Sequence, residues 1–352
     1  MRALQRERGS EFFVVRAAEL QGVPIELPAV AVVIPAYRAA ATIEAVLASI
    51  PTFVRHIVVV DDGGADRTAE VARTVDDPRV VVVEHERNEG VGAAVLTGYR
   101  RAAALGAEII AKVDADGQMD PEYLLALITP IVVGEADYAK GNRFLHEREL
   151  EAMPGRRRFG NAGLSFFTKL ASGYWGIFDP TNGYTAIHAS VIPLLDDRRI
   201  ARRFFFESSM LLNLSLLRAV VRDVYIPARY PGAKSHLSES RAALQFPAQL
   251  LRGFLRRIRI QYFVRDFSAV SLYVLCGSLL TLFGGIWGAW HFFVSSQTGV
   301  VATTGTVMIA VLPIIVGVQL LLQALTLDVQ GSPTTPIHAT ARLVKGEYPL
   351  DR

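Results

Sequence analysis

Two carboxylates and a carboxamide follow the end of an apolar stretch near the middle of the chain. Residues 109–113 read Ile-Ile-Ala-Lys-Val, and Asp114, Asp116 and Gln118 come next at alternate positions. Alternate residues of an extended chain point the same way, so these side chains can converge just past a strand. Oxygen ligands suit Mg²⁺ or Mn²⁺, which commonly bind one or two carboxylates together with a substrate diphosphate. The pattern therefore indicates metal-assisted chemistry on a nucleotide diphosphate, although Asp-x-Asp-Gly is also common in tight turns.

The elements that must hold these residues alternate between strand and helix. Strands are expected over residues 31–34, 57–60, 80–83 and 109–113, and helices over 43–50, from about 66, and over 91–105. This alternation predicts an α/β fold with a mainly parallel sheet and helices on both faces. Ligands of such sheets bind beyond the carboxyl ends of the strands. The polar clusters Pro35-Ala36-Tyr37, Asp61-Asp62 and Asp114-Ala115-Asp116 all fall at those ends.

A pair of glycines opens the third predicted helix. Gly90 and Gly92 half resemble a dinucleotide-binding fingerprint, but Val95 occupies the position of its third glycine. The motif also belongs to the third strand–helix unit rather than the first. We interpret these glycines as sites of close backbone packing, near a nucleotide or sugar.

The apolar residues are concentrated near the C-terminus. The chain is 51% hydrophobic, which is high for a wholly soluble enzyme, and residues 267–327 contain no Asp, Glu, Lys or Arg. That length predicts two membrane-spanning helices of about 20 residues, with a turn near residues 295–299. Aromatic residues near the end of the first span are typical of a membrane interface: Trp287, Trp290, Phe292 and Phe293.

An amphipathic helix is expected just before these spans, over residues 245–265. One face carries Leu251, Phe254, Leu255, Ile258 and Tyr262, and another carries Arg252, Arg256 and Arg259. This pattern is typical of a helix that lies in the membrane interface. With a net charge of +3 and no nucleic-acid-binding motif, anionic lipid is the expected partner and nucleic acid is not.

Arginines precede the first span, the turn between the spans has no Lys or Arg, and Arg342, Lys345 and Arg352 follow the second span. The positive-inside rule therefore places the N-terminal domain and the C-terminus in the cytoplasm, at the inner (cytoplasmic) membrane.

Taken in order, these clusters resemble the family 2 glycosyltransferases over residues 28–240. The resemblance rests on residues 33–37, Val59-Val60-Asp61-Asp62-Gly63-Gly64 and Asp114-Ala115-Asp116. Other segments are similar to the dolichyl-phosphate mannose synthase branch and its bacterial polyprenyl-phosphate relatives: residues 117–121, residues 179–184, Glu207, Arg229 and Lys234-Ser235. The chain departs from the family after Tyr37, where Arg38-Ala39-Ala40 replaces the common Asn-Glu, which leaves the preferred nucleotide base open.

The resemblance implies a GT-A fold (Rossmann-like, with a mainly parallel sheet) for the catalytic domain. We expect a leader over residues 1–27, the GT-A domain over 28–240 and juxtamembrane amphipathic helices over 241–266. Two transmembrane helices over 267–327 and a cytoplasmic tail over 328–352 complete the chain. Two spans of this kind often pack against copies of themselves, so a homo-oligomer is compatible with the sequence.

The activity implied is metal-dependent, inverting transfer of a sugar from a nucleotide-diphosphate sugar to polyprenyl (undecaprenyl or dolichyl) phosphate. The cation, Mg²⁺ or Mn²⁺, would be held by Asp114, Asp116 and Gln118. The nucleotide sugar would contact Pro35, Tyr37, Asp61, Asp62, Gly90 and Asp114. The acceptor phosphate would contact Arg143, Arg158, Arg229, Lys234 and Ser235. Asp114, Asp116, Arg143 and Arg229 are the expected catalytic residues.

Two alternatives remain open on the sequence. In the first, the sugar goes to a hydroxyl group of a glycolipid or polysaccharide, which needs a catalytic base such as Asp179 or Glu207. In the second, the chain binds a nucleotide sugar at the membrane without turnover. The two-carboxylate motif argues against the second alternative.

Overall fold

The computed structural model describes residues 27–143, 155–227 and 239–339. The chain divides into two compact units, Met1–Gly253 with Pro333–Arg352, and Phe254–Ser332. The first unit contains the sheet and the second contains two long helices, and each is described separately below.

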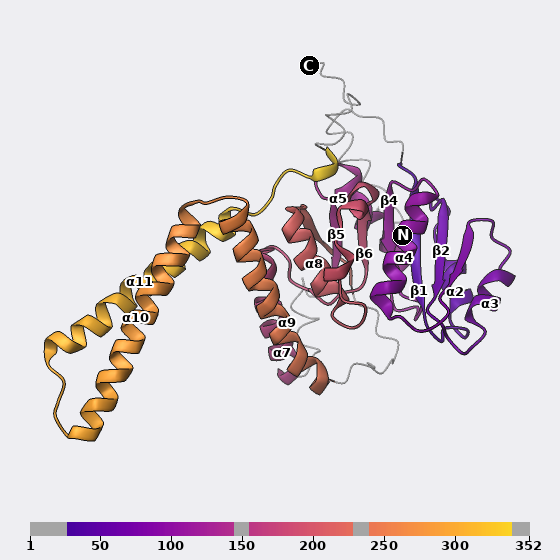
Figure 1. Ribbon diagram of the computed structural model, residues 1–352. Helices are drawn as coiled ribbons and strands as arrows, with labels where there is room; N and C mark the ends of the chain where they lie inside the picture. The colour runs from indigo at the N-terminus through magenta and orange to yellow at the C-terminus, as the bar shows by residue number, and fades with distance from the viewer. Residues whose placement is uncertain (1–26, 144–154, 228–238, 340–352) are drawn as a thin grey trace, which may run out of the picture. The chain divides into compact units, whose positions relative to one another are not determined.

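A seven-stranded sheet forms the centre of the first unit, with strand order β3-β2-β1-β4-β6-β5-β7 (Figure 1). Its strands are β1 Val30–Ala36, β2 His56–Asp61, β3 Val80–Glu84, β4 Ile109–Lys112, β5 Tyr138–Asn142, β6 Thr185–His188 and β7 Val221–Tyr225. Only β6 runs antiparallel to its neighbours, β4 and β5, and every other pairing is parallel. The expected mainly parallel α/β sheet is confirmed.

Helices cover both faces of this sheet, as expected. Within the described residues, the α-helices of the first unit are α2 Ile43–Ser49, α3 Thr68–Thr74, α4 Val91–Ala104, α5 Leu124–Val132, α7 Gly155–Ser172, α8 Phe206–Leu217 and α9 Glu239–Arg259, which continues into the second unit. Short 3₁₀ helices occupy Pro121–Tyr123, Ala189–Leu194 and Asp197–Arg199. The side chains of α2 and α5 pack on one face, and those of α4 and α8 pack on the other. Strand β1 is buried from both sides, which explains its unbroken apolar sequence.

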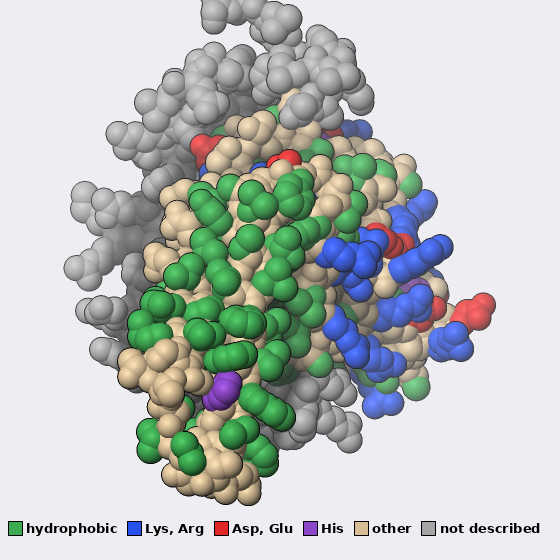
Figure 2. All heavy atoms as spheres, turned by 60° about the vertical axis from the view of Figure 1, so that its left-hand side comes forward, with side chains coloured by type: hydrophobic (Ala, Val, Ile, Leu, Met, Phe, Trp, Pro, Cys, Tyr) green, Lys and Arg blue, Asp and Glu red, His purple; other side chains and the backbone are tan. Residues whose placement is uncertain are grey.

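The second unit is built on a helical hairpin of α10 Ala269–Thr298 and α11 Thr304–Gln330. Both helices are long and apolar enough to cross a membrane, and Figure 2 shows hydrophobic side chains gathered over them. Helix α10 ends at Thr298, within the expected turn region 295–299, and Gly299 caps it with a left-handed φ of 69°. A Cβ on Gly284 would lie 2.5 Å from the carbonyl oxygen of Ala310, so small residues let the two backbones approach closely.

A buried ion pair lies beside the base of this hairpin. Helix α9 passes into one π-helical turn, Ile260–Val264, before α10 begins. The guanidinium of Arg257 donates two hydrogen bonds to Asp328, at 2.6 Å and 3.0 Å, and the hydroxyl of Tyr262 also donates to this carboxylate. Both charged side chains are buried. The pair therefore ties the end of α9 to the end of α11.

The segment after the hairpin returns to the first unit. The backbone N–H groups of Ile337 and His338 donate to the fully buried carboxylate of Asp137, at 2.9 Å and 3.1 Å. The imidazole Nδ1 of His338 lies 2.9 Å from the same carboxylate, and its ring stacks on that of His188 with centroids 4.3 Å apart. These contacts fasten residues 337–338 to the start of β5.

Candidate active site

The sheet brings the three polar clusters to one edge. Strands β1, β2 and β4 are parallel neighbours, so their carboxyl ends lie together. The N–H of Asp62 donates to the carbonyl of Ala36 at 2.8 Å, which fixes the end of β2 against the end of β1. Asp114 follows β4 after a single residue. Three carboxylates, Asp61, Asp114 and Asp116, therefore belong to the same edge, which we call the acidic edge.

The carboxylate of Asp62 makes three polar contacts within the protein. Its Oδ1 accepts from the N–H of Glu89 at 2.9 Å and lies 2.8 Å from Nδ1 of His85. Its Oδ2 accepts from the N–H of Gly90 at 2.8 Å, and the side chain is buried. Asp62 therefore positions the loop between β3 and α4, which contains Gly90.

Asp61 and Tyr37 have different surroundings. Burial raises the pKa of Asp61, although a hydrogen bond from the N–H of Gly64 at 3.1 Å opposes that shift. The ring of Tyr37 is 47% exposed, with the guanidinium of Arg38 over it. Gly63 makes the turn after these acids with a φ of +66°, and a Cβ there would lie 2.4 Å from the backbone carbon of Arg87. The turn therefore needs glycine on both conformational and steric grounds.

Asp114 is paired with a buried lysine that precedes it by two residues. The ammonium of Lys112 lies 2.7 Å from Asp114 Oδ1 and 3.4 Å from Glu207 Oε1, and its side chain is 1% exposed. Burial alone would lower the pKa of Lys112, but the two carboxylates outweigh it and raise the pKa. Lys112 is not among the site residues predicted from the sequence, although a lysine inside an otherwise apolar strand is a usable signal.

Gly183 packs directly on this ion pair. A Cβ at this position would lie 2.6 Å from Lys112 Nζ and 2.8 Å from Asp114 Oδ2. Gly183 and Tyr184 directly precede strand β6. The hydroxyl of Tyr184 donates to the carbonyl of Asp120 at 3.2 Å. The segment before β6 therefore covers the first carboxylate of the predicted metal motif.

Asp116 and Gln118 are exposed at the acidic edge. Asp116 Oδ1 accepts the N–H of Gln118 at 3.0 Å, which closes a local turn. Partial desolvation, and then the charge of Asp114, raise the pKa of Asp116. Among the described residues Asp116 forms no ion pair, unlike Asp114.

No group of three or more His, Cys, Asp or Glu side chains is gathered for a metal within the described ranges. A carboxylate with a raised pKa beside a second carboxylate nevertheless fits a hard cation whose remaining ligands are substrate oxygens and water.

A polar row crosses the sheet behind this edge. Lys112, Thr185, Lys140 and Asp223 are cross-strand partners on β4, β6, β5 and β7. Lys140 is 1% exposed and donates to the carbonyl of Asn182. Burial lowers the pKa of Lys140 to about 8, and burial raises the pKa of Asp223 to about 6. The row therefore contains two buried lysines, Lys112 and Lys140, whose neighbouring acids include Glu207 and Asp223.

Arg143, the first of the predicted phosphate-binding residues, is held by Asp179. Its Nε and Nη2 donate to the two carboxylate oxygens at 2.7 Å and 3.1 Å, and Asp179 is buried. Part of the Arg143 charge is thus already matched within the protein. The backbone of Arg158 lies in α7, but its side chain is outside the described part. Arg229, Lys234 and Ser235 also lie outside the described residues.

Comparison with known proteins identifies the family of the chain. The family model described as glycosyl transferase family 2 matches residues 31–193. The UDP-N-acetylglucosamine–dolichyl-phosphate N-acetylglucosaminyltransferase of Methanococcus voltae is 32% identical over 213 residues, which cover 56% of this chain and 84% of that protein. The polyprenol monophosphomannose synthase of Mycolicibacterium smegmatis is 33% identical over 144 residues, 40% of this chain and 54% of that protein.

The fold also matches a solved structure. Glucosyl-3-phosphoglycerate synthase from Mycobacterium tuberculosis, crystallised with Mn²⁺, uridine diphosphate and glucosyl-3-phosphoglycerate, superimposes with a TM-score of 0.50. The match covers 64% of this chain and 80% of that one, at 22% identity. The sheet is therefore GT-A-like, as the sequence resemblance implied.

Proposed function

Because this chain belongs to glycosyltransferase family 2, we propose that it transfers a sugar from a nucleotide-diphosphate sugar to a polyprenyl phosphate. The observation that carries the proposal is the acidic edge, where Asp61, Asp114 and Asp116 follow the carboxyl ends of neighbouring parallel strands. The 32% identical relative, of which 84% is matched, is itself named for transfer to dolichyl phosphate.

In this proposal Asp61 and Tyr37 contact the nucleoside, because both lie at the carboxyl ends of β2 and β1 and Tyr37 is open to solvent. Pro35, at the end of β1, contributes to the same wall. Asp62 acts indirectly by holding Gly90 and its loop in place.

Asp116 and Gln118, with Asp114, are the residues that would hold Mg²⁺ or Mn²⁺. When bound, the cation neutralises charge that builds on the leaving diphosphate. Lys112 keeps the carboxylate of Asp114 in a fixed position. The exposure of Asp116 leaves it accessible to a hydrated cation.

The acceptor supplies its own nucleophile. A phosphate monoester has a second pKa near 6, so it is largely ionised at pH 7 and needs no strong general base. A single displacement by its oxygen would invert the anomeric centre. Transfer to a hydroxyl would need a base, and both candidates are already engaged, Asp179 by Arg143 and Glu207 by Lys112.

The hairpin of α10 and α11 would anchor the enzyme in the membrane, with the catalytic domain and the C-terminus cytoplasmic. The exposed side chains of Leu251 and Leu255 on α9 support contact of that helix with the lipid interface. The segment boundaries given above, including the leader over residues 1–27 and the tail over residues 328–352, remain part of this proposal.

The test is nucleotide release by the detergent-purified protein, supplied with a panel of nucleotide sugars and either Mg²⁺ or Mn²⁺. Release should require polyprenyl phosphate and should favour one sugar donor. At the same cation concentration Asp116→Asn should strongly reduce release, while Asp76→Asn, a change at an exposed acid of another loop, should not. Release that is indifferent to lipid phosphate across the panel would overturn the proposed acceptor.

A further inference from the structure

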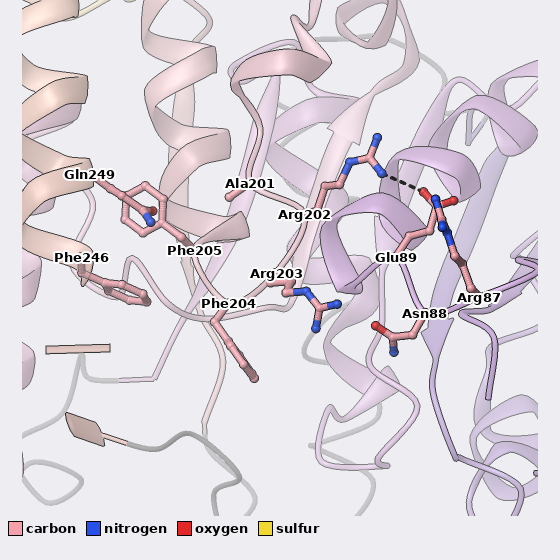
Figure 3. Close-up of a pocket in the computed structure, with 10 residues that line it drawn as sticks. All are labelled: Arg87, Asn88, Glu89, Ala201, Arg202, Arg203, Phe204, Phe205, Phe246 and Gln249. Atoms are coloured by element: carbon pink, nitrogen blue, oxygen red, sulfur yellow. Dashed lines mark hydrogen bonds and ion pairs between the residues drawn. The ribbon is translucent and has the colours of Figure 1, made fainter. Parts of the chain in front are cut away.

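A pocket of about 660 Å³ opens beside the acidic edge (Figure 3). Two chain segments form most of it, residues 87–89 before α4 and residues 201–205 before α8, and α9 adds Phe246 and Gln249. The first segment is anchored by Asp62, which accepts the N–H of Glu89. The second leads directly into Glu207, which lies 3.4 Å from the ammonium of Lys112. One wall of the pocket is therefore held by Asp62, and the other is continuous with the residue that contacts Lys112.

The walls of the pocket are held closely together. The N–H of Gly92 donates to the carbonyl of Arg202 at 2.8 Å. A Cβ on Gly90 would lie 2.3 Å from that carbonyl oxygen, and one on Gly92 would lie 2.2 Å from the carbonyl oxygen of Ala201. The close packing expected of these two glycines is confirmed, and it fixes the distance between the two walls.

Positive charge dominates one part of the pocket. Arg87, Arg202 and Arg203 line it, against the single carboxylate of Glu89. Arg202 pairs with that carboxylate at 3.0 Å. Neither Arg87 nor Arg203 forms an ion pair with any described residue. Two guanidinium groups therefore offer donors for an anion, and guanidinium binds phosphate oxygens through paired hydrogen bonds.

The other part of the pocket is aromatic. Phe205 packs edge-to-face on Phe246 with ring centroids 5.1 Å apart, while Phe204 is 64% exposed. Figure 3 shows Phe205 and Phe246 at one end of the pocket and Arg87 and Glu89 at the other. A large apolar ring that is left this open beside unpaired cations suits a ligand that is part anion and part hydrocarbon.

We propose that this pocket binds the phosphate and adjoining isoprene units of the lipid acceptor, with Arg87 and Arg203 on the phosphate and Phe204 on the hydrocarbon. This inference rests on the proposed function, and it adds an anion site to the one predicted at Arg143. A nucleotide diphosphate shares the phosphate chemistry but lacks the hydrocarbon, so the two sources can be separated by experiment.

The experiment measures equilibrium binding to the full chain in detergent, without turnover. The ligands are a short-chain isoprenyl phosphate, inorganic phosphate and uridine diphosphate. The Arg87→Gln/Arg203→Gln double variant should bind the isoprenyl phosphate at least about tenfold more weakly, because charged hydrogen bonds are lost. Its affinity for uridine diphosphate should be unchanged. Phe204→Ser should weaken binding of the isoprenyl phosphate but not of inorganic phosphate.

Arg198→Gln is the matched control, because Arg198 is an exposed arginine of the same unit that does not line the pocket. It should bind all three ligands as the unaltered protein does. The proposal is overturned if the double variant keeps its affinity for the isoprenyl phosphate, or if it loses uridine diphosphate to the same extent.

Sugar transfer by the unaltered protein separates the two proposals. Transfer to polyprenyl phosphate that the double variant performs equally well rejects the pocket and keeps the function. Arginine-dependent binding of the isoprenyl phosphate without any transfer to polyprenyl phosphate keeps the pocket and rejects the function.

Discussion

The ammonium of Lys112 lies 2.7 Å from the carboxylate of Asp114, two residues further along the chain. Glu207 of α8 reaches the same ammonium at 3.4 Å, so one buried cation joins the end of β4 to the start of α8. Asp114, the first carboxylate of the predicted metal motif, is thus held by a buried ion pair, whereas Asp116 is exposed to solvent. We infer that Lys112 presents Asp114 to the cation in a fixed position, whereas Asp116 binds the cation from an exposed position.

Lys112→Met should destabilise the protein and lower its activity. The change leaves two carboxylates without their buried partner, and breaking a buried pair in this way costs about 3–5 kcal/mol. The lower end is expected because Asp114 is one-third exposed and can be solvated. Thermal unfolding in detergent measures the effect. Glu207→Gln should cost less, because Asp114 still pairs with the lysine, and an unchanged Tm in Lys112→Met would reject the account.

Gly183→Ala should reduce sugar transfer, although it adds only one methyl group. The added methyl group would lie within 3 Å of both Lys112 Nζ and Asp114 Oδ2, so the ion pair must move. Overpacking of this kind costs about 1–3 kcal/mol. Gly176→Ala is the matched control, because nothing lies within 4 Å of a Cβ there. Equal activity of the two variants would show that Asp114 tolerates displacement.

Removal of divalent cations by a chelator should abolish nucleotide release, and Mg²⁺ or Mn²⁺ should restore it. Asp116→Asn should need a far higher cation concentration than the unaltered protein, because a charged ligand is replaced by a neutral one. Titration of the cation at a fixed donor concentration measures this. Full activity in the chelator would exclude the cation from the reaction.

Asp223→Asn should change the pH dependence of stability. The pKa of Asp223 is about 6 in the folded protein, above its ordinary value of 3.8, because the side chain is buried. The folded state therefore holds an extra proton between these values, and its stability falls as pH rises from about 4 to about 6. The variant lacks this loss, so its Tm relative to the unaltered protein should climb across that window and then level off.

Asp76→Asn, at an exposed carboxylate, is the control for this measurement and should show no such climb. Asparagine at position 223 keeps a carbonyl acceptor for the N–H of Phe178, which donates to Asp223 at 2.7 Å. A flat difference in Tm between pH 4 and pH 6 would show that Asp223 ionises normally in the folded protein.

Asp328→Asn should weaken the attachment of the hairpin to α9. Arg257 and Asp328 are both buried, so loss of the Asp328 charge breaks a buried ion pair, at a cost of about 3–5 kcal/mol. Thermal unfolding in detergent should show a lower Tm. Arg259→Gln, at an exposed arginine two residues further along, should leave the Tm nearly unchanged. Equal Tm values for both variants would mean that the ion pair contributes nothing to this unit.

The parallel half of the sheet and the positions of its acidic residues can be predicted from the amino-acid pattern. Strands β1, β2 and β4 are buried on both faces, which requires apolar runs that can be recognised without knowledge of their neighbours. Polar residues that follow such runs must lie at the same edge when the strands are parallel. The two long apolar helices could also be predicted, because a helix able to cross a membrane needs about 20 mostly apolar residues in a row.

The pairing of the charged side chains, by contrast, depends on the three-dimensional packing of the chain. Strand β6 enters the sheet antiparallel between β4 and β5, and it thereby places Gly183 on the Lys112 ion pair. The pairs Arg143–Asp179 and Arg257–Asp328 join residues 36 and 71 positions apart. Local periodicity reports which side of an element is buried, whereas such pairings depend on strand order and on side-chain packing. For that reason the sequence predicts Asp62 as a ligand contact, whereas the fold shows that its oxygens accept the N–H groups of Glu89 and Gly90.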